Sequence, residues 1–495
     1  MRLEELSRLL VGARVNGDPA AEVKGVAVDS RSVRPGDLFI CIPGVRQDGH
    51  DYADHAKRQG AAALVVERPL ETGLPEIVVK DARHAMAAIA CHVYGYPSHE
   101  MKVIGVTGTN GKSTVTHLLD HIFAEQGAVT GLMGTLGIKF GGRQYPTLNT
   151  TVDALEMQRW LRLMRDAGTE YCFMEVSSHA LAMGRVKGVN FRTAVFTNLT
   201  QDHLDFHGTM EAYKAAKGLL FSRLGNTFSA TPDGRKYAVL NADDEVSREF
   251  ANCTAAHTVT YGFSREADVR ADRIRYSPQG TRFRIESFAG EAEFHIPLVG
   301  KFNVYNALAA TAAALCEGLA LSDIAGRLAT AKGAEGRFQT VSAGQPFLVI
   351  VDYAHTPDSL ENVLSTISEF AEGRIYCVFG CGGDRDRTKR PVMGRIAARY
   401  SDCVILTSDN PRTEDPRVIL EEVERGIREE GMPSSDYYII EDRGLAIEKA
   451  VDLASPGDVV LIAGKGHETY QEINGVRIPF DDRVVAEQAI RRRMQ

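Results

Sequence analysis

The clearest pattern of hydrophobic and polar positions lies between residues 103 and 127. Residues 103–106 form an apolar run, VIGV, which is typical of a buried parallel strand. Apolar side chains then recur at helical spacing, and a glycine stands where the helix would end: Val115, Leu118, Leu119, Ile122, Phe123 and Gly127. The pattern therefore predicts a strand, a glycine-rich turn and a helix in direct succession.

The first hundred residues contain shorter elements of both kinds. Apolar runs predict strands at 23–28, 37–42, 61–66 and 77–79, and helical spacing predicts helices at 52–59 and 82–94. The opening segment, MRLEELSRLLVGARV, has the pattern of a short amphipathic helix. Tyr96-Pro97-Ser98 marks a linker. We therefore predict a small α/β domain over residues 1–100.

Residues 101–335 continue with strands and helices in alternation. Strands are predicted at 171–176, 192–198, 237–241 and 258–262, and helices at 157–167, 209–224 and 307–315. Residues 141–143 are typical of a hairpin turn, and residues 149–151, Asn-Thr-Thr, are typical of a helix start. Polar and apolar residues alternate over 267–297, which indicates antiparallel strands. The prediction is a central domain with a parallel sheet plus antiparallel strands.

The last part, residues 336–495, alternates strand and helix most regularly. Strands are predicted at 347–351, 375–379, 403–406, 438–440 and 459–462, with helical patterns between most of them. Such alternation is typical of a doubly wound parallel sheet, so we predict a Rossmann-like C-terminal domain. The fold class predicted for the chain is α/β with three domains, 1–100, 101–335 and 336–495.

Composition narrows the functional classes. The chain has 495 residues, of which 44% are hydrophobic and 25% charged, as in ordinary globular proteins. A net charge of −8 argues against a protein that binds nucleic acid by neutralising phosphates. Eight scattered cysteines without a C-x-x-C pair suggest reduced core residues. Without a signal peptide or a run of about 18 apolar residues, we expect a soluble cytoplasmic protein with no membrane insertion.

The glycine-rich turn after residue 106 carries the first candidate chemistry. A strand, a glycine-rich turn, Lys-Ser and a helix form the layout of a phosphate-binding loop, in which backbone N–H groups and the lysine face the phosphates and the hydroxyl ligates Mg²⁺. The general pattern has a glycine where Val106 stands, so the loop here is shorter, G-x-x-G-K-S. The alternative is a tight turn with a solvated lysine. The loop residues are Gly108, Thr109, Asn110, Gly111, Lys112, Ser113 and Thr114.

Polar residues also gather where two other strands of the central domain end. Glu175 stands at one strand end and is followed by Ser177-Ser178-His179. A carboxylate there can ligate Mg²⁺ beside a phosphate-binding loop, or be a structural acid. The segment 198–208, NLTQDHLDFHG, places two histidines and two aspartates at the next exit, which suggests metal, phosphate or substrate contacts. From pattern alone, Lys217 on the following helix is a solvated charge.

Four strand ends of the C-terminal domain are polar as well: residues 352–357, 380–386, 408–412 and 464–468. Open α/β sheets bind ligands at the carboxyl ends of their strands, so these loops predict a binding face. Arg385 and Arg412 suit the capture of carboxylates, and Glu468 suits an ammonium group. An amino acid or a similar molecule fits this mixture. In the first domain, the polar loops at 29–37 and 46–49 either hold an anionic small molecule or are simply solvated.

Taken together, these motifs resemble the Mur ligase family, and specifically its branch that adds the third amino acid. The matching segments cover essentially the whole chain: GTNGKST at 108–114, NTT at 149–151, EVSSHAL at 175–181, NLTQDHLDFHG at 198–208, KFNVYNAL at 301–308, DYAHTP at 352–357, GCGGDRDRTKRP at 380–391, DNPRTE at 409–414 and GKGHE at 464–468. The short G-x-x-G-K-S loop is the one that this family uses. The resemblance implies an N-terminal UDP-binding domain, a central ATPase domain and a C-terminal Rossmann-like domain for the incoming amino acid.

The resemblance also implies roles for individual residues. Contacts to ATP are implied for residues 108–114 and for Asn303, Arg337 and Asp352. Contacts to the UDP-muramyl-peptide are implied for Ser30, Val45, Arg46, Gln47, Asn149, Thr150, Thr151, Ser177 and Arg185. Contacts to diaminopimelate are implied for Arg385, Asp409, Asn410, Pro411, Arg412, Gly464 and Glu468. Two Mg²⁺ ions would be held by Ser113, Glu175, His203 and Lys217, the last as a CO₂-derived carbamate (N6-carboxylysine). Lys112, Lys217 and His203 would be the catalytic residues.

The reaction that follows is ATP-dependent amide formation in peptidoglycan precursor synthesis. UDP-N-acetylmuramoyl-L-alanyl-D-glutamate would be activated as an acyl phosphate and attacked by the amine of meso-diaminopimelate, in a protein expected to be monomeric. Three alternatives remain: a folylpolyglutamate synthetase, which should lack the UDP module and the Asp-Asn-Pro-Arg loop; a P-loop ATPase or switch without ligase chemistry; and the lysine-adding relative, against which that loop argues. Arg412 would select diaminopimelate, because lysine lacks the second carboxylate.

Overall fold

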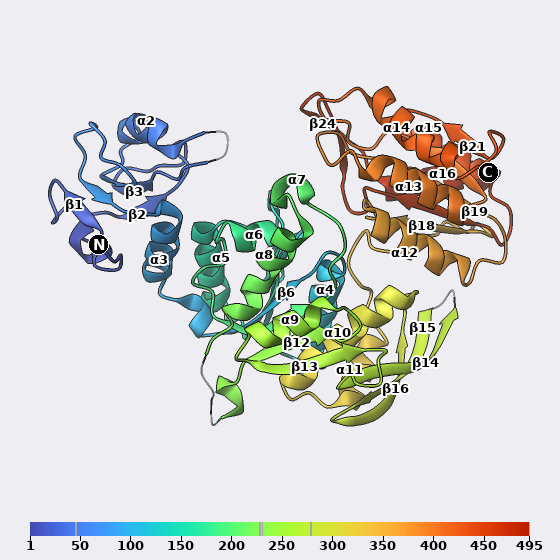
Figure 1. The fold of residues 1–495 in the computed structure, drawn as a ribbon, viewed down its shortest axis with the longest axis horizontal. Coiled ribbons are helices and arrows are strands. Elements are labelled where there is room, and N and C mark those ends of the chain that lie inside the picture. Colours follow the sequence, from blue (N-terminus) through green and yellow to red (C-terminus); the bar gives the residue numbers. More distant parts are fainter. Residues whose placement is uncertain (45–46, 227–228, 230, 278–279, 495) are drawn as a thin grey trace. The chain divides into compact units, whose positions relative to one another are not determined.

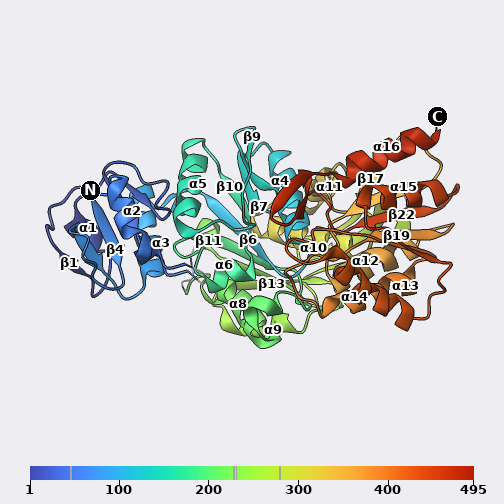
Figure 2. The same ribbon diagram turned by 90° about the horizontal axis from the view of Figure 1, so that it is seen from above.

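The computed structural model describes residues 1–44, 47–226, 229, 231–277 and 280–494, and it divides into two compact units. The first unit comprises residues 1–105, 127–194 and 223–236, and the second comprises 106–126, 195–222 and 237–495. Strands β6 (Lys102–Thr107) and β11 (Phe191–Phe196) begin in the first unit and end in the second. Figures 1 and 2 follow the chain by colour from its N-terminus to its C-terminus.

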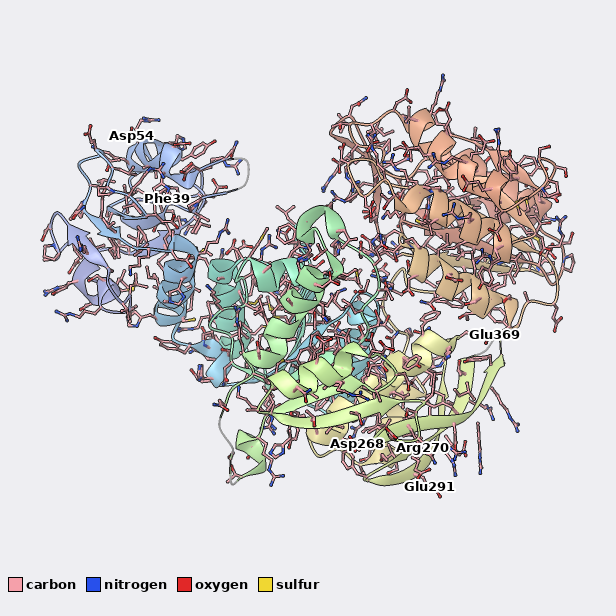
Figure 3. All side chains as sticks on the ribbon, in the orientation of Figure 1. Phe39, Asp54, Asp268, Arg270, Glu291 and Glu369 are labelled. Atoms are coloured by element: carbon pink, nitrogen blue, oxygen red, sulfur yellow. The ribbon has the colours of Figure 1, made fainter. Side chains whose placement is uncertain are left out.

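The N-terminal part of the first unit is a small sheet with strand order β1-β5-β4-β3-β2, in which β1 is antiparallel to β5 and the other pairs are parallel. Leu38 and Ile40 pack toward α1 and α3, whereas Phe39 packs toward α2 on the other face. Phe39 is buried, and Asp54 is exposed on α2 (Figure 3). The elements are α1 (Leu3–Ser7), β1 (Arg14–Asn16), β2 (Gly25–Ala27), β3 (Asp37–Ile40), η1 (Gly49–Tyr52), α2 (Ala53–Arg58), β4 (Ala63–Val66), β5 (Glu76–Val78), α3 (Ala82–Tyr94) and η2 (Pro97–His99).

The predicted helix over the opening fifteen residues is wrong beyond Ser7. The helix α1 ends there, Gly12 takes a positive φ of 79°, and β1 then pairs with β5. A five-residue helix is stabilised here by burial of Leu3 and Leu6 rather than by its length.

The remainder of the first unit carries four strands, two helices and one 3₁₀ turn in its described residues: β7 (Thr130–Gly134), β8 (Gly137–Phe140), β9 (Arg143–Tyr145), α5 (Ala154–Asp166), β10 (Tyr171–Glu175), α6 (Ser178–Ala182) and η3 (Pro232–Gly234). Strand β10 is parallel to β7, and β8 is antiparallel to both β7 and β9, so the predicted hairpin turn is confirmed. The predicted helix start at residues 149–151 is wrong, because Asp153 caps α5 instead by accepting from the N–H groups of Leu155 and Glu156.

The second unit contains the helix that follows the glycine-rich turn and the predicted antiparallel strands. Strands β12, β13 and β14 are parallel, and β14, β15 and β16 are antiparallel, as alternation over 267–297 predicts. Helix α10 is buried nearly all round and packs on α4 and on β12, β13 and β14. The elements are α4 (Lys112–Ala124), α7 (Leu204–His207), α8 (Met210–Ser222), β12 (Tyr237–Asn241), α9 (Val246–Cys253), β13 (His257–Gly262), β14 (Val269–Ser277), β15 (Gly280–Ser287), β16 (Gly290–Ile296), α10 (Lys301–Cys316) and α11 (Leu321–Leu328).

The C-terminal part of the second unit is a doubly wound sheet, as predicted. Its strand order is β17-β18-β22-β19-β20-β21, and only the β17–β18 pair is antiparallel among the pairs described. Helices α12, α13 and α14 cover one face and α15 and α16 the other (Figures 1 and 2). The elements are β17 (Gln339–Val341), β18 (Leu348–Asp352), α12 (Pro357–Ser368), β19 (Ile375–Phe379), α13 (Lys389–Tyr400), β20 (Cys403–Leu406), α14 (Pro416–Glu429), β21 (Tyr437–Ile439), α15 (Arg443–Leu453), β22 (Val459–Ala463), β23 (Tyr470–Ile473), β24 (Val476–Pro479) and α16 (Asp482–Met494).

Two further sequence predictions can be compared with the structure. Six of the eight cysteines are buried, which agrees with their use as small core residues. Within the described part of the chain, no helix combines the length and the apolar character needed to cross a bilayer. The domain boundaries at residues 100 and 335 stay predictions.

Candidate functional site

The glycine-rich turn lies between the end of β6 at Thr107 and the start of α4 at Lys112. Gly108 has φ +150°, and a Cβ atom there would lie 1.8 Å from Oγ1 of Thr197. No other residue fits this position without moving the loop after β11. The turn is therefore built by close approach of two loops, and the first glycine of the short motif makes that approach possible.

Residues of the loop after β11 form hydrogen bonds with backbone groups of the turn. The carbonyl oxygen of Asn198 accepts from the Thr109 N–H at 2.8 Å, and its side-chain Oδ1 accepts from the Asn110 N–H at 2.9 Å. Oγ1 of Thr197 donates to the Asn110 carbonyl at 2.6 Å. These contacts fix the conformation of the turn before any ligand binds, which is what a phosphate-binding loop requires.

Two lysines converge on this turn. Nζ of Lys112 donates to the carbonyl oxygens of Gly108 at 2.9 Å and Thr109 at 2.7 Å. Nζ of Lys217, on α8, donates to the same Gly108 oxygen at 2.7 Å. Ser113 and Thr114 follow on α4 and are buried. Lys112 on α4 and Lys217 on α8 thus reach the turn from two different helices.

Lys217 is buried, with 1% of its surface exposed, so the interpretation of this residue as a solvated charge is wrong. Burial, assisted by the charge of Lys112 and opposed by Asp202, holds its pKa well below the usual value for lysine. The Tyr213 ring covers the amine, with 4.3 Å between Nζ and the ring centroid. The lowered pKa favours the neutral amine, which is the form that reacts with CO₂.

His203 lies at the start of α7 in a left-handed conformation with φ 56°. Its Nε2 is 3.3 Å from Oδ2 of Asp202, and its backbone N–H donates to Oδ1 of the same carboxylate at 2.8 Å. Burial raises the pKa of Asp202, but the nearby positive charges, His203 first among them, hold it below the usual value. Asp202 is thus ionised and orients His203.

A second set of polar residues lies in the first unit around Glu175, which is 1% exposed. Oε1 of Glu175 accepts from the Thr135 N–H at 2.8 Å, and Oε2 accepts from the Thr135 hydroxyl at 3.1 Å. A Cβ on Gly134 would lie 2.2 Å from Oε1 of Glu175, so the carboxylate needs a glycine beside it. The Gly134-Thr135 turn after β7 therefore sets the position of this acid.

Thr135 also connects Glu175 to Thr150, because the two threonine hydroxyl oxygens lie 3.0 Å apart. A carboxylate only accepts hydrogen bonds, so Thr135 gives its single hydroxyl proton to Glu175. The proton between the two threonines must then come from Thr150. With this order, the Thr150 hydroxyl has no proton left to donate to a ligand, but its oxygen can still accept a hydrogen bond from one.

Thr151, Ser177 and Arg185 form the neighbouring part of this set. The Thr151 hydroxyl donates to the Glu175 carbonyl at 2.9 Å and accepts from the Ser177 N–H at 3.1 Å. Nη1 of Arg185 donates to the Thr151 carbonyl at 2.9 Å. Burial lowers the pKa of Arg185, while the Asp153 charge raises it. Asn149 is exposed at the edge of the group.

The remaining residues predicted to contact the UDP-linked substrate lie on the N-terminal sheet domain. Ser30 is buried between β2 and β3, and Gln47 is exposed. Val45 and Arg46 lie outside the described residues. The loop after Gln47 is anchored by His50, whose Nδ1 lies 2.6 Å from Oδ1 of Asp48 and whose Nε2 accepts from a backbone N–H.

The C-terminal domain brings together the ends of β20 and β22. Nδ2 of Asn410 donates to Oε2 of Glu468 at 2.8 Å. Buried Lys465 lies within hydrogen-bond distance of Asp409, Asn410 and Glu468. A Cβ on Gly464 would lie 3.3 Å from Oδ2 of Asp409. Acidic groups able to receive an ammonium are thus collected in one buried cluster.

Arg412 borders this cluster in a left-handed conformation, with φ 53°. Its Nη1 donates to the Gly383 carbonyl at 2.7 Å, and a Cβ on Gly383 would lie 1.9 Å from the Pro411 carbonyl oxygen. The glycine therefore lets the loop after β19 meet the loop after β20. Arg385 lies on that first loop and donates to the carbonyl of Asp384 at 3.1 Å. Arginines, which suit carboxylates, and acids, which suit an ammonium group, thus lie at adjoining strand ends.

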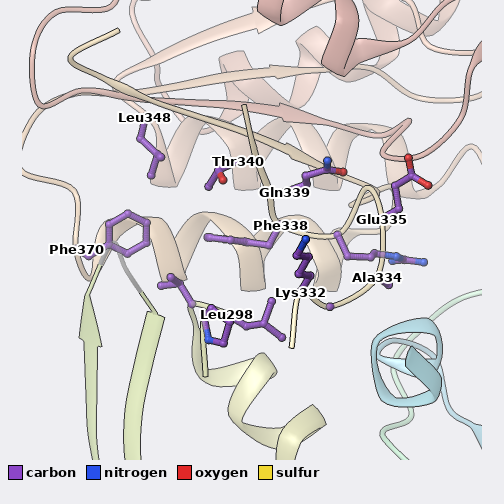
Figure 4. A pocket seen from close by; sticks show the side chains of 13 residues that line it. Leu298, Lys332, Ala334, Glu335, Phe338, Gln339, Thr340, Leu348 and Phe370 are labelled. Carbon is purple, nitrogen blue, oxygen red and sulfur yellow. The ribbon is translucent and has the colours of Figure 1, made fainter. Parts of the chain in front are cut away.

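Asn303 and Asp352 each hydrogen-bond to a residue that lines a cavity of about 470 Å³ (Figure 4). Nδ2 of Asn303 donates to the Val299 carbonyl at 2.9 Å, and Oδ2 of Asp352 accepts from the Phe338 N–H. Val299, Arg337 and Phe338 line the cavity, as do Leu348 and Phe370. Burial raises the pKa of Asp352 to about 6, against the opposing charge of Arg337.

The sequence matches three protein-family models along most of its length. They are the Mur ligase family catalytic domain at residues 22–94, the Mur ligase middle domain at 106–314 and the Mur ligase glutamate ligase domain at 336–466. The chain belongs to the Mur ligase family. Its α/β fold consists of the N-terminal, middle and C-terminal domains of that family.

Individual Mur ligases resemble the whole chain. A UDP-N-acetylmuramoyl-L-alanyl-D-glutamate–2,6-diaminopimelate ligase from Halalkalibacterium halodurans is 51% identical over 493 residues, which is 100% of this chain and 99% of the relative. A solved structure of a ligase with the same description has a TM-score of 0.70 and 35% identity, covering 100% of this chain and 99% of its own. A MurF ligase from Thermotoga maritima in complex with ADP shares the fold, with a TM-score of 0.66, 20% identity and coverages of 95% and 99%.

The structure of this Mur ligase brings together most of the residues that the resemblance names, in three groups. The turn at 108–114 with Lys217 and His203 forms one, the set around Glu175 another, and the C-terminal cluster the third. Among the described residues, no group of three or more His, Cys, Asp or Glu side chains is arranged to hold a metal ion. Glu175 belongs to the first unit, whereas Ser113, His203 and Lys217 belong to the second.

Sequence reasoning missed the residues that position these groups. Asn198 hydrogen-bonds to the turn, and the Tyr213 ring covers the amine of Lys217. Thr135 donates to Glu175, and Lys465 donates to the acids of the C-terminal cluster. Asn198 and Lys465 lie inside the quoted motifs, so their presence there was the available signal. Thr135 and Tyr213 lie outside every motif, and only the fold reveals their role.

Proposed function

We propose that this Mur ligase joins meso-diaminopimelate to UDP-N-acetylmuramoyl-L-alanyl-D-glutamate, using ATP, in the synthesis of peptidoglycan precursors. The observation that carries the proposal is the C-terminal cluster of Asp409, Asn410 and Glu468, with Arg412 on the loop that carries Asn410. A ligand with both carboxylate and ammonium groups at its distal end fits this arrangement. The relative from Halalkalibacterium halodurans, which carries this activity in its description, supports it over the full chain length.

The phosphates of ATP would bind at the turn formed by residues 108–114. From there a line of side chains leads toward the cavity of Figure 4. A Cβ on Gly111 would lie 2.4 Å from Oδ1 of Asn306, Asn306 donates to Oδ1 of Asn303 at 3.3 Å, and Asn303 donates to the cavity-lining Val299. We infer that the adenine end of ATP points along α10 toward this cavity, where Arg337 lies.

Mg²⁺ would be held by Ser113, Glu175, His203 and a carbamate on Lys217. Hydroxyl and carboxylate oxygens suit this hard cation, and the buried, neutral amine of Lys217 suits carbamylation. The bound ions would neutralise charge on the phosphates and the attacking carboxylate. Lys112 contributes positive charge to the same step from its position over the turn.

The chain's residues then have three tasks. The first is to place the substrate carboxylate beside the γ-phosphoryl group, with Ser30, Gln47, Asn149, Thr150, Thr151, Ser177 and Arg185 holding the UDP-linked peptide and Val45 and Arg46 assisting. The second is to exclude water, which would hydrolyse the acyl phosphate. The third is to present the amine of diaminopimelate from the C-terminal cluster, so that the amide forms and phosphate leaves.

The deciding experiment measures phosphate release with meso-diaminopimelate and with L-lysine. We expect release only when ATP, UDP-N-acetylmuramoyl-L-alanyl-D-glutamate and diaminopimelate are all present, with kcat/KM for lysine lower by about 100-fold or more, since lysine leaves the Arg412 guanidinium unpaired. Equal use of lysine would favour the lysine-adding relative. Release that needs no amino acid would indicate a P-loop ATPase or switch, and glutamate addition to a folate would indicate a folylpolyglutamate synthetase.

The assembly and location of the protein belong to the same proposal. We infer a monomer, because one chain carries all three groups of site residues, and light scattering on the purified protein measures the molar mass directly. A larger mass that persists on dilution would contradict this inference. We also infer a cytoplasmic location, where ATP and UDP-linked precursors are found.

A further inference from the structure

Lys465 is a fully buried lysine at the centre of the C-terminal cluster, with 0% of its surface exposed. Its Nζ lies 3.0 Å from Oδ1 of Asn410, 3.2 Å from Oε2 of Glu468 and 3.3 Å from Oδ1 of Asp409. The Tyr470 ring centroid is 5.6 Å from the same nitrogen. A lysine is rarely buried so completely unless opposite charges and hydrogen-bond acceptors surround it, as they do here.

The ammonium group has no proton left for a ligand. It carries three N–H donors, and it has three acceptors within hydrogen-bond distance, one on each of Asp409, Asn410 and Glu468. Because all three are side chains of the chain itself, Lys465 does not contact substrate directly. Any effect of this residue on the amino acid must therefore pass through its three neighbours.

The first effect is on the orientation of Asn410. Its Oδ1 accepts from Lys465 and from the Glu472 N–H at 2.9 Å, so the amide oxygen points toward these donors. The amide nitrogen is then turned to Glu468, to which it donates at 2.8 Å. An ammonium at this position fixes which end of the Asn410 side chain faces the acid.

The second effect is on the charge of the cluster. Asp409 and Glu468 together bring two negative charges and Lys465 brings one positive charge, so the three groups sum to one negative charge. The side chains of Asp409, Glu468 and Lys465 are 9%, 16% and 0% exposed, respectively, so water screens their charges only weakly. One further ammonium, brought by the amino acid, completes the neutralisation. Without Lys465, Asp409 and Glu468 would give the cluster a net charge of two negative units.

We propose that Lys465 is the positioning residue of the amino-acid site: it orients Asn410 and Glu468 and leaves the cluster one positive charge short of neutrality, so that the cluster accepts a single substrate ammonium group. This inference rests on the proposed function of the cluster as the diaminopimelate site. It predicts selectivity as well as affinity. Diaminopimelate carries no net charge near neutral pH, whereas L-lysine carries one positive charge.

The test compares Lys465→Met, Glu468→Gln, the double variant and Lys449→Met, a control lysine on α15 whose Nζ lies over the Tyr438 ring. Steady-state KM is measured for diaminopimelate, ATP and the UDP-linked substrate. We expect Lys465→Met to raise KM for diaminopimelate by about 10- to 100-fold, the range for hydrogen bonds to charged groups, and to leave the other two KM values within about 2-fold. Lys449→Met should change none of them.

Two further readouts separate positioning from general damage. Because part of the Lys465 effect passes through Glu468, KM for diaminopimelate in the double variant should exceed that of Glu468→Gln alone by less than tenfold. Inhibition by L-lysine should strengthen relative to binding of diaminopimelate in Lys465→Met, since the cluster gains a net negative charge. Losses that multiply in the double variant, an equal rise in KM for ATP, or an unchanged lysine-to-diaminopimelate ratio would each overturn the inference.

The design also distinguishes this inference from the proposed function. If Glu468→Gln leaves KM for diaminopimelate unchanged, the amino acid binds elsewhere, and the assignment of the cluster fails. If Glu468→Gln raises KM and Lys465→Met does not, only the role of Lys465 fails. Should Lys465→Met not fold, the double variant removes one charge of each sign, and its KM is compared with that of Glu468→Gln: a further rise of less than tenfold supports the inference, and a larger one overturns it.

Discussion

Lys112 and Lys217 donate to one and the same oxygen atom, the carbonyl of Gly108, at 2.9 and 2.7 Å. Lys217 is buried and lies close to the ammonium group of Lys112, so its pKa falls well below that of an ordinary lysine. The turn thereby brings together two lysines, one of which, Lys217, has a lowered pKa that favours the neutral amine.

Lys217→Ala should abolish ligation, and a short carboxylic acid added to the assay should restore part of the activity by standing in for the carbamate. In the wild-type protein, ¹³C-labelled bicarbonate should give a carbamate signal by NMR that the variant lacks. Because only the neutral amine reacts with CO₂, the signal should weaken as pH falls and the amine becomes protonated. Absence of both the signal and the rescue would contradict the carbamate.

Lys214→Ala is the matched control for this experiment. Lys214 lies one turn earlier on the same helix, where its Nζ pairs with Glu249 at 2.8 Å, and it does not contact the turn. Its replacement removes a lysine from α8 without touching Gly108, so activity should remain within about 2-fold, as for most surface substitutions.

Arg412→Ala should raise KM for diaminopimelate by about 100-fold or more and leave ATP binding nearly intact. A guanidinium that pairs with a carboxylate contributes about 2–4 kcal/mol when the alternative is an unpaired charge. Calorimetric titration with ATP and steady-state kinetics with diaminopimelate measure the two effects separately. Arg417→Ala, which removes an arginine whose side chain is 80% exposed, is the control. An equal loss of ATP binding would contradict the assignment.

Thr135→Val should raise the Mg²⁺ concentration needed for half-maximal activity by about 3- to 10-fold, because Glu175 loses one of its two hydrogen bonds from Thr135, the one from the hydroxyl. Thr135→Ser keeps the hydroxyl and should stay close to wild type. The double variant with Thr150→Val tests the inferred proton order, since Thr150 donates to Thr135. If valine and serine behave alike at position 135, the hydroxyl does not position Glu175.

Asp352→Asn should change how stability depends on pH. With a folded pKa of about 6 against a usual 3.8, the wild-type carboxyl binds its proton more tightly in the folded protein. Its contribution is therefore fully present below about pH 4 and is lost as pH rises through 6, by about 1–2 kcal/mol between pH 5 and 8. Asparagine cannot ionise, so the variant should gain stability relative to wild type over this interval in scanning calorimetry. If the stability of both proteins depended on pH in the same way, the raised pKa of Asp352 would be contradicted.

The parts of this fold that the sequence predicts are those set by local pattern. The strand, turn and helix from Val103 to Phe123 follow from apolar spacing, and so do the doubly wound strands of the C-terminal domain. The opening helix fails because pairing of β1 with β5, a contact across sixty residues, overrides its local pattern. The helix start assigned to residues 149–151 fails because Asp153 was the better cap.

The chemistry of single side chains is harder to predict, because it depends on burial. Lys217 and an ordinary surface lysine look alike in a sequence, and only the fold shows that Tyr213 and the Gly108 carbonyl pack against its buried amine. Lys465 is similar: three acceptors from two loops surround it, and the loops meet only in the folded sheet. Motifs name such residues, but the fold gives the reason.

The left-handed backbone of Arg412, at φ 53°, has a consequence for how this protein can evolve. A side chain other than glycine costs about 1 kcal/mol or more in that conformation, so Arg412→Gly would relieve strain in the loop while removing the guanidinium. Under the proposed role of Arg412, the most stable version of this loop and the version that recognises a second carboxylate are therefore different sequences. Selection for thermal stability alone would favour loss of diaminopimelate recognition. A screen for more thermostable variants should therefore find inactive enzymes with a glycine at this position.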